Sequence, residues 1–204
     1  MLDVDCEARW VYGRAGFELD EVPAATKLAR RLGVAIRRVE GYLVRGGNAC
    51  TITLHGVRTI CLRRRLTRVA ARFAICHELA EIRLIELGYQ ELDVEDRADE
   101  LGAALACPRD AFRSAVRAHG RLDFEQLALD FTTDETCAAL RVGEVVGVPL
   151  AVVAPRRVRV RGGPCEWPDE RTLRRVARTG GPGVARAVLR DDPRRIVLVA
   201  EDAA

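Results

Sequence analysis

The sequence predicts an α+β domain over residues 1–147 and a small α/β appendage over residues 148–204. Three observations predict this organisation. Short segments rich in β-branched residues lie between residues 34 and 62. Helical periodicity dominates from residue 67 to residue 147, and β-type segments return after it. A chain of 204 residues has room for one domain of ordinary size and a small addition.

The first half of the domain begins with a predicted helix and a small sheet. Between Pro23 and Gly33 the apolar residues follow helical spacing, and Gly33 is a suitable stop. Strands are then expected at 34–39, 49–54 and 57–62. The last two are joined by His55-Gly56, which is typical of a tight hairpin.

Helices dominate the next segment. Thr67 can cap a helix over residues 68–87, which Gly88 would close. A second helix is expected over residues 92–106, because Pro108 prevents its continuation. Residues 122–147 predict two further helices around the polar turn "TTD".

The appendage is predicted from alternating apolar segments. "VPLAVVA" (148–154), "RVRVRG" (157–162) and "RIVLVAE" (195–201) are typical of strands, and residues 169–178 of a helix. The chain therefore ends in a mixed unit with its own small core.

Composition indicates a cytoplasmic protein. No apolar segment approaches the roughly 18 residues of a membrane span, and the first residues do not resemble a secretion signal. The seven cysteines are odd in number and scattered, which favours reduced thiols. Lys27 is the only lysine among 33 basic residues, so arginine runs reflect composition and are weak evidence for nucleic acid.

The segment "AICHELAEI" carries the candidate chemistry. It resembles a His-Glu-x-x-His zinc helix with Glu81 in place of the second histidine. On a helix, His77 and Glu81 lie about 40° apart, one turn above the other. Glu78 lies beside them, where a general base can reach a metal-bound water.

A third metal ligand is expected from the following helix. Glu95, Ala98 and Gly102 share one face of it. The two small residues allow close approach, so Glu95 would point towards His77 and Glu81. A site with one imidazole and two carboxylates suits zinc, and also harder ions such as Mn²⁺ or Fe²⁺. The alternative is a solvated helix on which Glu78 and Glu81 merely flank arginines.

These motifs resemble those of the ImmA/IrrE metallopeptidases. "RFAICHELAE" and "EDRADELGAALACP" follow the family's His-Glu-x-x-His helix and its second motif, and the resemblance extends over about residues 23–146. It implies a minimal zincin-like fold in which zinc is bound by His77, residue 81 and Glu95, with Glu78 as general base. It also implies a helix-turn-helix repressor as the protein substrate.

Two functional hypotheses follow. The first is an intracellular metal-dependent endopeptidase that cleaves a partner transcriptional repressor. The second is a catalytically weak or inactive family member that binds metal or the repressor. Direct nucleic-acid binding is not expected, because the helix over residues 135–146 offers one arginine and two glutamates to a polyanion.

Overall fold

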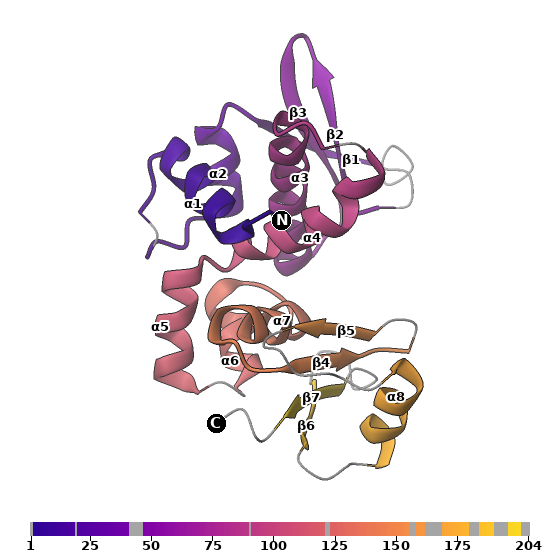
Figure 1. The fold of residues 1–204 in the computed structure, drawn as a ribbon. Helices are drawn as coiled ribbons and strands as arrows, with labels where there is room; N and C mark the ends of the chain where they lie inside the picture. Colours follow the sequence, from indigo (N-terminus) through magenta and orange to yellow (C-terminus); the bar gives the residue numbers. More distant parts are fainter. Residues whose placement is uncertain are drawn as a thin grey trace. The chain divides into compact units, whose positions relative to one another are not determined.

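The computed structural model divides the chain into two compact units (Figure 1). Unit 1 comprises Met1–Ala111 and Phe131–Thr133, and unit 2 comprises Phe112–Asp130 and Asp134–Ala204. The structure describes residues 2–18, 20–40, 47–89, 91–120, 123–155, 158–161, 169–179, 184–189 and 196–200. The fold class is α+β, as predicted.

Unit 1 combines helices with a three-stranded sheet. Its elements are α1 (Val4–Ala15), α2 (Ala25–Arg31), β1 (Ala35–Val39), β2 (Ala49–Leu54), β3 (Val57–Arg63), α3 (Arg68–Glu86) and α4 (Glu91–Ala106). The strand order is β1-β3-β2, with β1 parallel and β2 antiparallel to β3. Apart from α1, each element lies where the sequence predicts it.

The β2–β3 hairpin has the turn that its sequence predicts. His55 and Gly56 both have positive φ, at 49° and 80°, as a two-residue turn with a right-handed strand twist requires. This turn pairs Leu54 with Val57 and sets the register of the whole hairpin. Because β3 pairs with β1 on its other side, β2 lies at one edge of the sheet. The hairpin projects from unit 1 in Figure 1.

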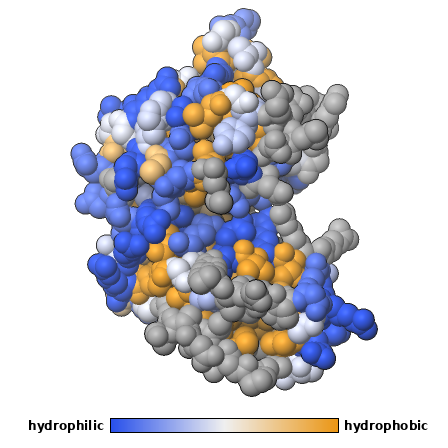
Figure 2. Space-filling view, in the orientation of Figure 1, coloured by the Kyte–Doolittle hydropathy of each residue, from blue (hydrophilic) through white to orange (hydrophobic). Residues whose placement is uncertain are grey.

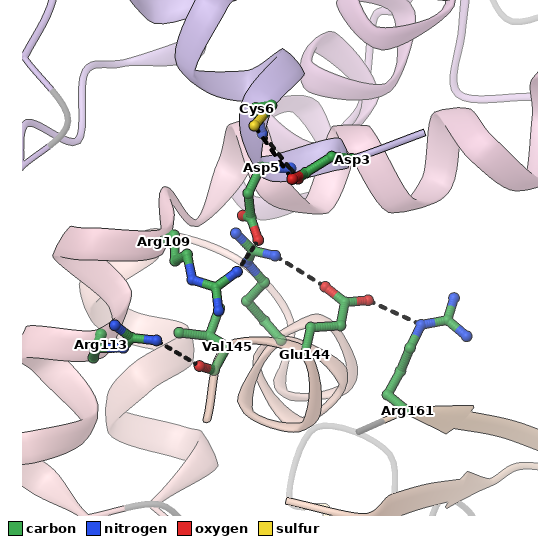
Figure 3. Close-up of polar contacts among 9 residues, drawn as sticks. Asp3, Asp5, Cys6, Arg109, Arg113, Glu144, Val145 and Arg161 are labelled. Carbon is green, nitrogen blue, oxygen red and sulfur yellow. Dashed lines mark hydrogen bonds and ion pairs between the residues drawn. The ribbon is translucent and has the colours of Figure 1, made fainter. Parts of the chain in front are cut away.

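Helix α1 was not predicted, although its signals are present. Asp3 accepts hydrogen bonds from the amides of Asp5 and Cys6, and Gly16 ends the helix at a φ of 71°. Figure 3 shows this cap, together with the 2.6 Å ion pair between Asp5 and Arg109. The buried residues Ala8, Val11, Tyr12 and Ala15 follow helical spacing. The helix therefore forms one wall of the core, and the Tyr12 hydroxyl donates to the carbonyl of Leu105 in α4.

The packing of α3 against α4 depends on Gly102. A Cβ atom at this position would lie 3.0 Å from His77 Cα and 3.2 Å from His77 N. Those are backbone atoms, which cannot move aside as a flexible side chain can. The expectation that small residues on α4 allow close approach is therefore confirmed at Gly102.

Unit 2 contains helices and a four-stranded antiparallel sheet of order β5-β4-β7-β6. Its elements are α5 (Arg109–His119, which begins in unit 1), α6 (Phe124–Phe131), α7 (Glu135–Val146), β4 (Leu150–Val153), β5 (Val158–Arg161), α8 (Glu170–Thr179), β6 (Val184–Val188) and β7 (Ile196–Ala200). Helix α5 and strand β6 were not predicted from the sequence. In α5 only Phe112 and Val116 are buried, so the apolar face of this helix is narrow.

The division between the units does not coincide with the predicted boundary after Gly147. Helix α7 packs on β4 and β5, and Arg161 donates to Glu144 at 2.9 Å (Figure 3). Gly143 is so close to Arg161 that an added Cβ would lie 2.9 Å from the arginine Cβ. Helix α7 thus shares a core with the C-terminal strands. The prediction that the ImmA/IrrE-like domain ends at Gly147 stays a prediction.

One face of the molecule can be followed in Figure 2. Figure 2 shows hydrophilic residues over much of the visible face, with hydrophobic patches between them. Among the described helices, none combines the length and the apolar character that crossing a bilayer requires.

Replacing Gly102 with alanine tests the role of the α3–α4 contact. We expect Gly102→Ala to lower the free energy of unfolding by about 1–3 kcal/mol, because the new methyl group overpacks backbone atoms of α3. Urea denaturation followed by circular dichroism measures this change.

Gly13→Ala is the matched control, since a Cβ at this position in α1 meets nothing within 4 Å. It should raise stability by about 0.5–1 kcal/mol through helix propensity. Equal effects of the two substitutions would show that the contact at Gly102 is not tight.

Candidate metal centre

Helix α3 places His77 and Glu81 on one face, as their spacing predicts. His77 Nε2 lies 3.5 Å from Glu81 Oε1, and the side chains are 17% and 24% exposed. The neighbouring residues Cys76, Leu79 and Ala80 are buried in the core. The core packing therefore fixes the rotation of α3 and directs both polar side chains to the same opening.

Glu95 of α4 completes the predicted group. Its Oε2 atom lies 3.6 Å from His77 Nε2. One ligand atom from each of His77, Glu81 and Glu95 can be chosen so that all three lie within 4.8 Å of one another. The Glu95 side chain is 77% exposed. The predicted convergence of these three side chains is thus present in the structure.

The spacing and chemistry of these donors fit a divalent cation. Two ligands at about 2.1 Å from a tetrahedral ion lie about 3.4 Å apart. The two distances from His77 Nε2, 3.5 Å and 3.6 Å, are close to that value. Imidazole nitrogen and carboxylate oxygen are both accepted by zinc, manganese and iron.

Asp99 is a further residue of the candidate site, and it was not predicted from the sequence. Its Oδ1 atom lies 3.2 Å from His77 Nδ1, on the opposite side of the ring from Glu81 and Glu95. A carboxylate in this position holds the ring and leaves Nε2 directed at the metal site. The available signal was its position four residues after Glu95, on the same face of α4.

The carboxylates around His77 change its protonation. Burial by itself lowers the pKa of His77, but the hydrogen bond with Asp99 and the contacts with Glu81 outweigh it and raise the pKa to about 10. The imidazole is therefore charged at neutral pH when no metal competes for Nε2. A metal would have to displace that proton, because only the neutral ring coordinates.

Glu78 is buried beside the three predicted ligands. Thr51 of β2 donates a 2.6 Å hydrogen bond to Glu78 Oε2. Burial raises the pKa of the Glu78 carboxyl to about 7; the hydrogen bond from Thr51 lowers it, and the charge of Glu81 adds to the rise. A carboxyl group with a pKa near neutrality is suited to accept and return a proton.

These residues line one cavity of about 460 Å³ in unit 1. Its walls come from β2, α3 and α4, and they include the four carboxylates of Glu78, Glu81, Glu95 and Asp99. No arginine or lysine is among the residues described as lining it. The cavity is therefore acidic and favours a cation.

Comparisons with known proteins agree with this geometry. A family model described as the IrrE N-terminal-like domain, Peptidase_M78, matches residues 26–156. This range includes every residue of the candidate site named above. No curated protein matches the chain significantly. A solved Mycobacterium tuberculosis transcriptional regulator has a TM-score of 0.64, with 14% identity, over 98% of this chain and 88% of that chain. At this identity the likeness shows the fold alone.

Substitution of Glu81 tests whether it is a metal ligand. Glu81→Ala should weaken zinc binding by roughly tenfold or more, because two protein ligands remain. Glu81→His should strengthen it, because zinc prefers imidazole and the site gains one unit of positive charge. Calorimetric titration with zinc measures both, and the unchanged protein should take up close to one ion per chain.

Glu86→Ala is the control for this series, because Glu86 lies on the same helix and pairs with Arg14 and Arg58 away from the cavity. Its zinc affinity should equal that of the unchanged protein. Indistinguishable titrations of all four proteins would mean that Glu81 binds no metal.

Asp99 is tested by a graded pair of substitutions. Asp99→Ala should weaken zinc binding by about 10- to 100-fold, because the ring of His77 loses its acceptor. Asp99→Asn should have a smaller effect, since the amide oxygen can still accept from Nδ1. Equal zinc affinities in a competition titration would exclude a positioning role for Asp99.

Proposed function

This chain belongs to the IrrE N-terminal-like domain family of peptidases, and we propose that it is a metal-dependent endopeptidase acting on a partner protein. The convergence of His77, Glu81 and Glu95 next to the buried Glu78 is the observation that supports this proposal most directly. The proposed substrate is a helix-turn-helix transcriptional repressor, as the resemblance to the ImmA/IrrE family implies.

The side chains have distinct roles in the proposed reaction. His77, Glu81 and Glu95 would hold a divalent cation, which would supply Lewis-acid activation of water and of the scissile carbonyl. Glu78 accepts a proton from the attacking water and returns it to the leaving amine. Thr51 holds Glu78 by donating to its Oε2, which keeps the carboxyl group directed along the cavity.

Glu81 determines how strongly the metal can act. Two carboxylates and one neutral imidazole bring the charge of a divalent centre to zero, whereas a second histidine would leave it at +1. A neutral centre lowers the pKa of water less. We therefore propose slower cleavage with zinc than a His, His, Glu site would give, and use of Mn²⁺ or Fe²⁺ as an alternative.

The position of β2 suggests how a peptide is held. Among the described strands, β2 pairs only with β3. Its residues Ala49, Cys50 and Thr51 line the cavity that contains Glu78. An extended substrate segment can add to such an edge through backbone hydrogen bonds, which would place its peptide bonds alongside the carboxylates.

A second candidate function is favoured by one observation, the carboxylate at position 81. A member with a weakened centre can bind its repressor in the same cavity without cutting it. Metal content does not separate the two candidate functions, because both would bind metal. Cleavage of the repressor separates them, because only the peptidase would cut it.

Glu78→Gln separates them. If the protein is a peptidase, this substitution should reduce cleavage of its helix-turn-helix repressor substrate by about 10²–10⁴-fold, because it removes the general base. Zinc affinity should stay nearly unchanged, because no ligand is lost. Mass spectrometry of the products and calorimetric titration measure the two quantities.

Glu86→Gln, on the same helix but away from the cavity, should cleave normally. Cleavage retained by Glu78→Gln would show that another group is the base. Stable repressor binding without any cleavage, in the unchanged protein supplied with Zn²⁺, Mn²⁺ or Fe²⁺, would support the second candidate.

A further inference from the structure

A second cavity of unit 1, of about 300 Å³, has the opposite charge to the metal site. Arg38 of β1, with Arg68 and Arg72 of α3, lines it, and no carboxylate is among its described lining residues. The chain as a whole has 33 basic and 30 acidic residues. The lining of this cavity is therefore much more positive than the chain as a whole, in which basic and acidic residues are nearly equal in number.

Arg72 is the buried part of this cavity. The residue is 8% exposed. It donates to the carbonyls of Pro23 at 2.7 Å and Ala106 at 2.8 Å, and its Nε has no partner among the described residues. In the described part of the chain, no carboxylate forms an ion pair with it. A buried cation compensated only by carbonyl dipoles is costly, and an anion nearby would reduce that cost.

Arg38 and Arg68 are exposed, so their guanidinium groups can adjust to a ligand. Arg38 is held by one hydrogen bond, which its Nη1 donates to the carbonyl of Arg64 at 3.0 Å. A guanidinium has five donors in a planar fork that matches phosphate and carboxylate oxygens. The three arginines together thus provide many more donors than the protein itself uses.

The remaining wall is apolar. Ala25, Ala71 and Ile75 line the cavity and are 5%, 7% and 2% exposed. The volume is at the lower end of the range of small-molecule sites, which are apolar with a few placed polar groups. A bare anion would leave this wall without a partner.

We propose that this cavity binds a small organic anion whose phosphate or carboxylate group is held by Arg38, Arg68 and Arg72 and whose apolar part contacts Ala25, Ala71 and Ile75. No described residue lines both this cavity and the one that contains His77. The ligand is therefore distinct from the peptide substrate, and its binding does not depend on the proposed peptidase activity.

Calorimetry with simple probes tests the proposal. The full chain is treated with a chelator, so that no probe binds through a metal, and ionic strength is held constant with chloride. We expect phenyl phosphate or benzoate to bind at about one per chain, and phenol not to bind. The stronger of the two anions identifies the group that the arginines hold.

Exposed arginines provide the variants, because replacing the buried Arg72 could unfold the protein. Arg68→Gln and Arg38→Gln should each weaken binding of the anionic probe by roughly tenfold or more. Arg31→Gln is the matched control, since Arg31 is exposed on α2 and does not line the cavity. Circular dichroism verifies that all three variants fold.

Each remaining outcome opposes the proposal. No binding of either anion overturns it, as does equal binding by the unchanged protein and both cavity variants. If inorganic phosphate bound as tightly as phenyl phosphate, the proposed contact between the ligand and the apolar wall would be wrong. The cavity would then be a site for a simple oxyanion. Binding of phenol would show that the arginines do not select the ligand.

Discussion

The close contact between α3 and α4 is the constraint on which the candidate metal site depends. His77, Glu78 and Glu81 lie on α3, whereas Glu95 and Asp99 lie on α4, so neither helix carries the whole site. The absence of a side chain at residue 102 lets the backbones meet at His77, where an added Cβ would lie 3.0 Å from Cα. A larger residue would move Glu95 and Asp99 away from the imidazole that they contact on opposite sides.

Charge is the second organising feature of the site. Three carboxylates lie within 3.6 Å of the ring nitrogens of His77, and Glu78 is buried next to them. Like charges at such distances raise one another's free energy unless a cation compensates them. Protonation of His77 provides one positive charge, and a divalent ion would provide two. The arrangement therefore favours cation binding.

Helix α3 has cavities of opposite sign along its length. The acidic cavity contains His77, and the basic cavity contains Arg72, five residues earlier. Arg72 also binds the carbonyl of Ala106 at the end of α4. The two helices that carry the candidate metal site are thus joined at a second place by an arginine. A ligand of that arginine would contact these helices without entering the cavity that contains His77.

The sequence by itself determined the elements with strong local signals and the residues related by helical spacing. Thr67, Gly88 and the His55-Gly56 turn set the limits of α3 and of the hairpin, and the i, i+4 spacing brought His77 and Glu81 together. Helix α1, helix α5 and β6 were not predicted, although α1 carries a capping aspartate, a terminal glycine and helical spacing of its buried residues. Only the tertiary structure decided the contacts between distant segments: Asp99 with His77, Thr51 with Glu78 across 27 residues, and Arg72 with Ala106 across 34. The physical reason is packing. Burial of the apolar faces that two elements share decides which of their polar side chains meet, and no local sequence pattern contains this information.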